Sequence, residues 1–325
     1  MARIVDVAAR AGVSTATVSR VLNGKQVRPE LRSAVNQAID ELGYAPDRTA
    51  RSLRRRHSDV IALIVPDIEN PFFTSLARGV EDVAHESGLS VVLCNTDEDP
   101  AKQERYLRVA DEDNVAGVIL APSGPSERLS KLQERGRAVV LVDRTMEGWE
   151  VDHVVFDNVE LGRRATQSLI DRGFERIACI TGPSETPTAV SRAQGWSQAL
   201  AEAGLDSAAE PPLYANFRVD GGLKAMGELL ERERSPEAVV ATNNLVGVGA
   251  LRALAAHARD QVGVGIIGDL PFVTSNVEDV SLLWLHPREM GLAAARLLVR
   301  RIQGETGDPR RIIQPTQDVV FGAGK

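Results

Sequence analysis

The chain has 325 residues, of which 45 are acidic and 38 basic, so its formal net charge is −7. That length predicts about two domains, and a hydrophobic content of 43% with 26% charged residues excludes a disordered or fibrous chain. No apolar run approaches the roughly 20 residues that a membrane helix needs, and the first residues lack the pattern of a signal peptide, so we expect a cytoplasmic protein without a membrane partner.

The charge is unevenly distributed along the chain. Up to Asp59 there are 11 basic and 6 acidic residues, a net charge of +5, whereas from Val60 onward 27 basic and 39 acidic residues give −12. A basic amino-terminal segment on an acidic body is expected where only one end of a protein meets a polyanion. The charge alone also fits a slightly basic, solvated helical cap, so the local sequence has to decide between the two.

The amino-terminal segment has the pattern of three short helices. Residues 4–11 place apolar side chains at helical spacing, Gly12 interrupts the pattern, and Ser14 is a good N-cap for a second helix over residues 15–22. A third helix is predicted over residues 29–42. A short helix, a glycine turn and a second helix that starts with small polar residues form the helix-turn-helix arrangement, whose second helix enters the major groove of DNA.

The start of the second helix is suited to reading base pairs. Thr15 and Ala16 are slim enough to enter the major groove, and Arg20, one turn later, can reach guanine O6 and N7 or a phosphate. The sequence therefore predicts a DNA-binding module, with a generic three-helix cap as the alternative.

Several strings of residues in this chain resemble the LacI/GalR family of transcription regulators. They are VDVA at 5–8, GVS at 12–14, TVSRVLNG at 17–24, LGYAP at 42–46, ARSL at 50–53, VPDIENPFF at 65–73 and PT at 315–316. The first three form the family's DNA-binding signature, and the match continues over essentially the whole chain. The resemblance implies a DNA-binding protein that is controlled by a small ligand.

The resemblance also implies roles for individual side chains of the DNA-binding module. Bases are read at the positions of Thr15, Ala16 and Arg20, and phosphates are contacted at those of Ser14, Thr17, Ser19 and Asn23. One departure concerns the third helix, where this chain has Arg28 and the family often has Ser or Thr. Loss of that N-cap should cost the helix about 1 kcal/mol, and a phosphate contact by Arg28 could offset part of the loss.

Residues 47–56 form a second predicted DNA element. Asp47 can cap a helix of about eight residues, which is too short to be stable alone. The resemblance implies a hinge helix that forms when it pairs with its dimer mate in the minor groove, where Leu53 wedges between base steps. The matching groove positions are Ala50, Arg51, Leu53 and Arg54. An ordinary basic linker is the alternative.

After residue 59, short apolar runs alternate with helical stretches. The runs are residues 60–65, 90–94, 117–121, 138–142, 177–181, 239–242 and 262–267, and helices are expected around 73–87, 102–111, 127–135, 162–171, 194–203, 222–231 and 247–257. This alternation predicts an α/β body of parallel sheets covered by helices, in two lobes with a cleft at the carboxyl ends of their strands. Cys94 and Cys179 lie in such runs, and we expect both to be buried free thiols.

The resemblance implies that this body is a periplasmic-binding-protein type I fold, in which the chain crosses three times between the lobes. We expect the crossings near Asn158, Leu285 and Pro315. The expected organisation is a helix-turn-helix domain at 1–46, a hinge helix and linker at 47–58, and an effector-binding and dimerisation domain at 59–325. Its first lobe comprises about 59–157 and 286–314, and its second about 158–285 and 315–325.

The sequence contains no recognisable catalytic or metal-binding constellation. GVGIIG at 263–268 fits the G-x-G-x-x-G fingerprint, but it lies on an apolar run and no helix follows, so we reject a dinucleotide site. The histidines are scattered without ligand spacing, and Asp97-Glu98-Asp99 is interpreted as a solvated loop rather than a metal site. We therefore expect neither an enzyme nor a bound metal or cofactor.

The candidates for ligand binding are residues that follow the strands of the body, although such residues also build turns. They are Asp67, Asn70, Phe72, Asp143, Arg144, Thr186, Thr188, Arg192, Asn243, Asn244 and Asp269, and the resemblance adds Phe217 at a stacking position of the family. Arg192 is the leading candidate, because the family position points it into the cleft and a guanidinium can hold sugar hydroxyls or a carboxylate. Asp143 and Arg144 could instead pair with each other.

Two departures from the family pattern concern the ligand. Many relatives have Asn-Asp where this chain has Asn243 and Asn244, and the family's Gly-Phe-Asp-Asp is replaced by IIGD at 266–269, so carboxylates are lost. A sugar or a related metabolite is implied as the effector. The resemblance further implies a repressor that binds a pseudo-palindromic operator as a homodimer. A solute-binding or sugar-processing protein with the same body is the rival hypothesis.

Overall fold

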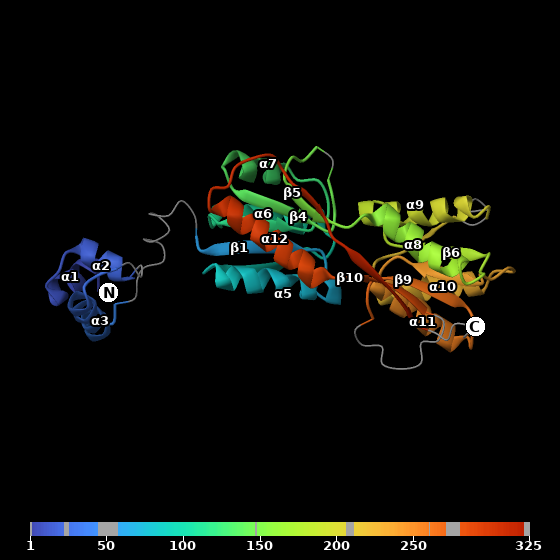
Figure 1. Ribbon diagram of the computed structural model, residues 1–325, viewed down its shortest axis with the longest axis horizontal. Helices are drawn as coiled ribbons and strands as arrows, with labels where there is room; N and C mark the ends of the chain where they lie inside the picture. Colours follow the sequence, from blue (N-terminus) through green and yellow to red (C-terminus); the bar gives the residue numbers. More distant parts are fainter. Residues whose placement is uncertain are drawn as a thin grey trace. The chain divides into compact units, whose positions relative to one another are not determined.

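The computed structural model describes residues 2–22, 26–44, 58–146, 148–205, 211–259, 261–270 and 280–321. The chain divides into two compact units, Met1–Ser58 and Asp59–Lys325, and each is described by itself (Figure 1). Some predicted DNA contacts lie outside the described residues, namely those of Asn23, Ala50, Arg51, Leu53 and Arg54.

The described part of the first unit contains the helices α1 (Ile4–Ala11), α2 (Thr15–Leu22) and α3 (Pro29–Leu42) around a small apolar core. Gly12 follows α1 with a φ of 65°, a left-handed conformation that glycine adopts without steric cost and that ends the helix. Val7, Val18 and Val35 are completely buried between the helices. The order of the helices and the turn at Gly12 confirm the predicted helix-turn-helix.

The first turns of α2 and α3 are stabilised differently. The Ser14 hydroxyl accepts a hydrogen bond from the backbone N–H of Thr17 at 3.2 Å, which satisfies one of the amides left free at the start of α2. Arg28 occupies the N-cap position of α3 and makes no side-chain hydrogen bond to the helix. The start of α3 therefore lacks the stabilisation of about 1 kcal/mol that a Ser or Thr cap provides.

Within the described residues, the body contains two six-stranded sheets. In the first, which defines lobe 1, the order is β11-β5-β4-β3-β1-β2, with β1 (Val60–Val65), β2 (Ser90–Asn95), β3 (Gly117–Leu120), β4 (Ala138–Val142), β5 (Asp152–Val155) and β11 (Arg311–Ile313). In the second, which defines lobe 2, the order is β12-β10-β9-β8-β6-β7, with β6 (Ile177–Thr181), β7 (Leu213–Tyr214), β8 (Ala238–Ala241), β9 (Gly263–Ile267), β10 (Val280–Leu285) and β12 (Thr316–Phe321). Neighbouring strands are parallel except β10 and β12, which are antiparallel.

Each sheet is covered by helices on both faces. In lobe 1, α5 (Pro71–Glu86) and α12 (Pro287–Ile302) pack on one face, and α6 (Pro100–Glu112) and α7 (Glu127–Glu134) on the other. In lobe 2, α8 (Asn158–Ile170) and α9 (Pro187–Glu202) oppose α10 (Val219–Leu230) and α11 (Asn244–Ala256). The inner strands β1, β3, β4, β6, β8 and β9 are buried on both faces, which explains why they are continuous apolar runs in the sequence.

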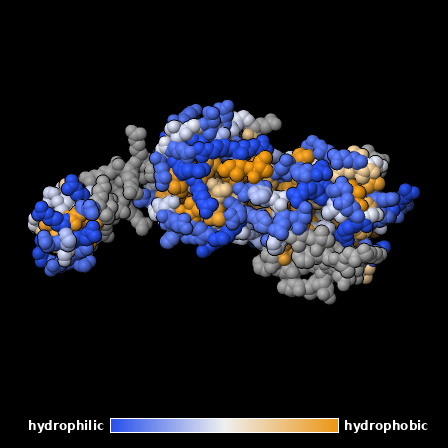
Figure 2. Space-filling model, in the orientation of Figure 1, coloured by the Kyte–Doolittle hydropathy of each residue, from blue (hydrophilic) through white to orange (hydrophobic). Residues whose placement is uncertain are grey.

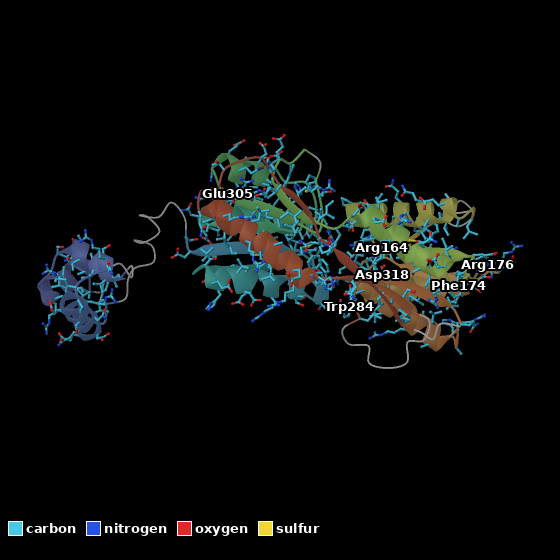
Figure 3. The ribbon with its side chains drawn as sticks, in the orientation of Figure 1. Arg164, Phe174, Arg176, Trp284, Glu305 and Asp318 are labelled. Atoms are coloured by element: carbon cyan, nitrogen blue, oxygen red, sulfur yellow. The ribbon has the colours of Figure 1, made fainter. Side chains whose placement is uncertain are left out.

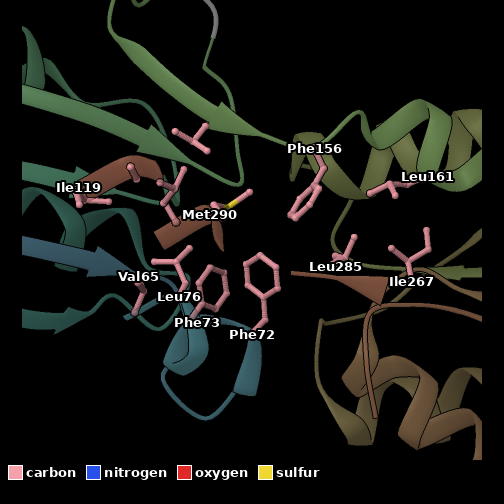
Figure 4. Close-up of a cluster of buried hydrophobic side chains, with 14 of the residues drawn as sticks. Val65, Phe72, Phe73, Leu76, Ile119, Phe156, Leu161, Ile267, Leu285 and Met290 are labelled. Carbon is pink, nitrogen blue, oxygen red and sulfur yellow. The ribbon is translucent and has the colours of Figure 1, made fainter. Parts of the chain in front are cut away.

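The chain passes between the lobes at three points. It leaves lobe 1 after β5 and enters α8, returns after β10 to α12, and leaves again between β11 and β12. Figure 4 shows Phe156 and Leu285 at two of these crossings, with Phe72 of α5 close to them. The rings of Phe72 and Phe156 are 6.3 Å apart, and both belong to one apolar cluster that continues into both lobes. The cluster joins the lobes near the cleft, while the rest of each lobe keeps its own core.

Most helices of the body begin earlier than the sequence pattern indicates, whereas α7 begins at Glu127 as predicted. The helix predicted at 194–203 begins at Pro187, where Thr186 is the N-cap residue and proline occupies the first turn. Thr188 and Arg192 therefore lie on α9 and not in a loop. The helix expected at 247–257 likewise begins at Asn244. These first turns were missed because polar and small residues in them hide the apolar period.

Several elements of the body have no counterpart in the prediction, namely β5, β7, β10, β11, β12 and α12. β12 is held to lobe 2 by an ion pair, since Arg164 Nη2 donates to Asp318 Oδ1 at 2.6 Å, and both residues are labelled in Figure 3. The prediction that Cys94 is buried is wrong: it is half-buried because β2 is an edge strand, whereas Cys179 is buried in β6. GVGIIG begins on β9 and no helix follows it directly, as predicted.

Candidate functional site

The predicted base-reading side chains lie on the outer face of α2. Thr15, Ala16 and Arg20 are exposed, whereas Val18 points into the core. The predicted phosphate contacts within the described residues are exposed at Ser14 and half-buried at Thr17 and Ser19. Figure 2 shows a largely hydrophilic surface on this unit. The start of α2 is thus accessible to a groove of DNA, and the individual contacts stay a prediction.

A cavity of about 410 Å³ lies between the two lobes of the body, beyond the carboxyl ends of strands from both sheets. Its size is within the range of small-molecule sites. All the predicted cleft residues line it except Thr186, which is the N-cap residue of α9. The lining residues that the sequence analysis did not propose are Phe73, Asp97, Glu98, Pro183, Asn216, Arg218, Asp220, Ile267, Gly268 and Leu285.

Arg192 is buried in the cleft and held by two hydrogen bonds. It is 5% exposed, its Nε donates to Asn158 Oδ1 at 2.8 Å, and its Nη1 donates to the Thr242 carbonyl at 2.6 Å. Burial lowers the pKa of Arg192 to about 10, although the nearby Asp143 carboxylate opposes the shift. At neutral pH the guanidinium therefore remains charged, and its position is set by two hydrogen bonds within lobe 2.

Asp143 and Arg144 follow β4 and are both buried. Arg144 binds Glu98 with two hydrogen bonds of 2.6 Å and also donates to the Pro122 carbonyl, while its Nε is 3.7 Å from Asp143 Oδ2. Glu98 is thus the closer partner of Arg144, which corrects the interpretation of residues 97–99 as merely a solvated loop. Burial raises the pKa of Asp143, while Arg192 and Arg144 act to lower it.

Two asparagines connect the lobes across the cleft. Asn244, in the first turn of α11, donates from Nδ2 to Asn70 Oδ1 at 3.2 Å. Asn70 precedes α5, and the same oxygen accepts the backbone N–H of Phe72 at 3.0 Å. Asn243 caps α11 by accepting the Val246 N–H at 2.8 Å. Asn70 and Asn243 therefore build helix starts while lining the cavity, so the turn-building alternative applies to them as well.

Phe217 presents its ring to the cavity from the loop before α10. The ring lies against the backbone of Gly182, where an added Cβ would be 2.2 Å from the ring carbon Cζ. Any side chain at position 182 would therefore displace the ring, since real contacts of this kind are never so short. Phe72 adds a second ring to the lining from lobe 1.

The charged groups of the lining are predominantly acidic. Its three guanidinium groups each lie near a carboxylate: Arg144 beside Glu98, Arg192 beside Asp143, and Arg218 beside Asp67 and Asp97. The cavity additionally contains Asp220 and Asp269, so six carboxylates face three guanidinium groups. An excess of ionised carboxylates opposes an anionic ligand, although burial, which raises the pKa of Asp143 and of Asp269, works against the ionised form of these two.

Sequence reasoning could have found the residues it missed. Asp97 and Glu98 follow the carboxyl end of β2 in the same way that Asp67 follows β1, and Arg218 is adjacent to Phe217. The loop at 216–218 reaches the cleft because it follows β7. That strand was not predicted, since two residues are too few to show an alternating apolar pattern.

No helix in the described part of the chain is long and apolar enough to span a membrane. Among the same residues there is no group of three or more His, Cys, Asp or Glu side chains arranged to hold a metal ion.

Two family models match the chain, one on each unit. Residues 3–47 match the model of bacterial regulatory proteins of the lacI family, and residues 58–318 match that of periplasmic binding proteins and the sugar-binding domain of the LacI family. Together they account for nearly all the residues that the structure describes.

Similar proteins include two named regulators. The chain is 39% identical to the HTH-type transcriptional regulator CelR of Thermobifida fusca, over 98% of this chain and 97% of that protein. It is 35% identical to the ribose operon repressor of Halalkalibacterium halodurans, over 98% and 96% of the two chains.

Similar solved structures cover both units. The complex of the transcriptional regulator CelR with cellobiose has a TM-score of 0.74 at 35% identity and covers 100% of both chains. The lac repressor dimer bound to operator and the anti-inducer ONPF has a TM-score of 0.84 at 20% identity, with 98% of both chains covered, and supports the fold alone.

Proposed function

Because this chain belongs to the LacI family of bacterial regulatory proteins, we propose that it is a transcriptional repressor that binds operator DNA and responds to a small molecule in the cleft. The observation that carries the proposal is the combination, in one chain, of an exposed recognition face on α2 with an interlobe cavity lined by polar and aromatic side chains. A ligand that fits one separation of the lobes better than another shifts the balance between the two forms of the protein.

We assign base reading to the exposed start of α2, at Thr15, Ala16 and Arg20. The first two offer small side chains that let the helix approach the base edges, and Arg20 offers the two-pronged donor that suits guanine. We assign phosphate contacts, which hold the register, to the hydroxyls of Ser14 and Thr17. The sequence of residues 47–56 supports a hinge helix in the minor groove.

We propose that the effector is an uncharged carbohydrate. The excess of carboxylates disfavours a phosphorylated or acidic ligand, whereas carboxylate and amide groups accept and donate hydrogen bonds to sugar hydroxyls. The rings of Phe72 and Phe217 offer apolar faces to a pyranose. Since the similar CelR structure is a complex with cellobiose, this uncharged disaccharide is the first ligand to test.

The carboxylate ligand that Arg192 could also hold is the weaker alternative. Asp143 lies near the Arg192 guanidinium and partly neutralises it, and two of its donors are already used by Asn158 and Thr242. The remaining donors can bind a neutral hydroxyl without bringing a second negative charge next to Asp143. A ligand carboxylate would be repelled by the Asp143 carboxylate.

A dimer on DNA is the proposed assembly. A short hinge helix gains stability when it pairs with a second copy, and a twofold assembly reads a pseudo-palindromic site. The lac repressor, which shares this fold, has been solved as a dimer on its operator. Analytical ultracentrifugation at micromolar concentration should give a dimer, and a stable monomer would contradict this part of the proposal.

We infer that the cleft binds its ligand without transforming it, since the family consists of regulators. A sugar-processing activity is the alternative. Prolonged incubation of the protein with cellobiose should leave the disaccharide intact, and release of glucose would establish the alternative.

The decisive experiment measures DNA and ligand binding on the full chain. Pseudo-palindromic duplexes are selected from a randomised pool at low salt, and their affinities are measured by fluorescence anisotropy with and without cellobiose. We expect sequence-specific binding that cellobiose changes, and we expect Arg20→Ala to remove the specificity. Failure to select any duplex would refute the repressor function, whereas selection without an effect of cellobiose would refute only the ligand.

A further inference from the structure

Arg218 bridges the two lobes of the body at the cleft. It lies in lobe 2, at the N-cap position of α10, next to Phe217. Its Nη2 donates to Asp97 Oδ1, and its Nε is 3.6 Å from Asp67 Oδ2. Both carboxylates belong to lobe 1, in the loops that follow β2 and β1. One guanidinium group thus spans from one lobe to two separate loops of the other.

The loop after β2 adopts an unusual conformation that directs its carboxylates into the cleft. Asp97 and Glu98 are successive residues with φ of 57°, a left-handed region that side chains other than glycine seldom occupy. Glu98 binds Arg144 within lobe 1, and Asp97 binds Arg218 across the cleft. Lys102 is a second partner of Asp97, at 3.4 Å, but lies in the same lobe. The backbone is therefore held so that one carboxylate anchors the loop and the other faces lobe 2.

We propose that Arg218 is a positioning residue of the ligand site, which holds the two lobes together through Asp67 and Asp97 before ligand binds. The hydrogen bond from Asn244 to Asn70 also runs from a donor in lobe 2 to an acceptor in lobe 1, and both side chains are buried. Arg218 is 44% exposed, so it can release its partners to solvent when the lobes separate. Only the predicted effect of Arg218 on ligand affinity rests on the proposed function; the bridge between the lobes does not.

The consequence is a preference for the closed form in the free protein. If a ligand binds only the closed form, its apparent affinity is its affinity for that form multiplied by the fraction of the protein that is closed. A larger open fraction therefore lowers the apparent affinity. Removal of the bridge increases that fraction, and so weakens binding without touching the ligand. Because exposed ion pairs are individually weak, the expected loss is about two- to fivefold.

The lobe separation of the free protein tests the proposal directly. Nitroxide labels are placed on the full chain at Lys131→Cys in α7 and Lys224→Cys in α10, both on exposed sites of opposite lobes, after Cys94→Ser and Cys179→Ala remove the native thiols. Dilution with unlabelled protein isolates distances within one protomer. Pulsed electron-spin measurements then give the distance distribution without any ligand.

Arg218→Gln and Asp97→Asn should each broaden the distribution toward longer distances. The wild type should shift in the same direction at about 1 M NaCl, where screening acts over about 3 Å, and the Arg218→Gln variant should respond less. Arg163→Gln is the matched control, since Arg163 is a part-exposed arginine that pairs with Glu160 and Glu202 inside lobe 2. Distributions that are unchanged in Arg218→Gln and insensitive to salt in the wild type would overturn the proposal.

Calorimetric titration with cellobiose separates positioning from direct contact. If Arg218 acts through Asp97, the double variant should bind no more weakly than the weaker single variant. Independent, additive losses would instead mean that Arg218 contacts the ligand itself, which overturns its positioning role. If the wild type does not bind cellobiose, the proposed ligand is wrong, and the distance measurement still decides the role of Arg218.

Discussion

The close contact between α8 and α9 gives the sharpest prediction for stability, at Gly162→Ala. A Cβ at Gly162 would lie 1.9 Å from the carbonyl oxygen of Arg192, and one at Gly195 would lie 1.9 Å from that of Val159. The two helices therefore touch through glycines, backbone against backbone. Because the contacted atom at Gly162 belongs to the turn that carries Arg192, any displacement moves the leading side chain of the cleft.

Two opposing effects determine the size of the change. Alanine is favoured over glycine inside a helix by about 1 kcal/mol, which stabilises the variant. Overpacking costs about 1–3 kcal/mol, and a clash with a backbone oxygen belongs at the upper end because no side chain can rotate away. We therefore expect a net loss of about 2 kcal/mol in the free energy of unfolding.

Gly227→Ala is the matched control, because Gly227 also lies inside a helix, α10, but has no atom within 4 Å of the added Cβ. It should gain up to about 1 kcal/mol from helix propensity alone. Thermal unfolding of the full chain, followed by circular dichroism, should place the transition of Gly162→Ala below the wild type and that of Gly227→Ala at or above it. Equal stability of the two variants would refute the packing argument.

Three further predictions concern DNA, ligand and pH. Leu53→Ala should weaken operator binding by a few kcal/mol through loss of the minor-groove wedge, while cellobiose affinity is unchanged. Arg192→Ala should abolish the response to ligand but keep operator binding, as read from anisotropy titrations with and without cellobiose. Burial raises the pKa of Asp152, but two hydrogen bonds from Arg301, of 2.7 and 2.9 Å, contribute to a net lowering. Asp152→Asn should therefore cost about 2–3 kcal/mol at pH 7, and its deficit should shrink as the pH falls below about 4, where the carboxylate of the unfolded wild type takes up a proton before that of the folded protein.

For each of these three predictions, one result would contradict the reasoning. An unchanged operator affinity in Leu53→Ala would remove the hinge-helix assignment, and a full ligand response in Arg192→Ala would exclude that residue from the site. For Asp152→Asn, thermal unfolding over a pH series is the measurement. A deficit that is constant from pH 7 to pH 3 would show that the carboxylate charge does not stabilise the fold, because a lowered pKa contributes its full stability above the unfolded value and loses it as the pH falls toward the folded one.

The local pattern of the sequence was sufficient for the helix-turn-helix and for the main strands. Gly12 ends α1 at the point where the apolar period of the sequence breaks. Runs such as residues 60–65 are apolar because both faces of the strand are covered. The starts of α9 and α11 were predicted too late, since α9 begins with Pro187 and Thr188 and α11 with Asn244, all of which line or adjoin the cleft. Residues that line the cavity occupy the first turns of these helices, and they obscure the apolar period from which a helix is recognised.

What the sequence by itself determined is the order of elements, the division of charge between a basic amino-terminal segment and an acidic body, and which residues follow the strands. Only the tertiary structure decided which of these residues face one another. Arg144 pairs with Glu98, 46 positions away, and Arg218 meets Asp97, 121 positions away. The first pairing depends on the order of the strands within one sheet, and the second on how the crossings of the chain place the carboxyl ends of the two sheets opposite each other. No local period in the sequence records either arrangement.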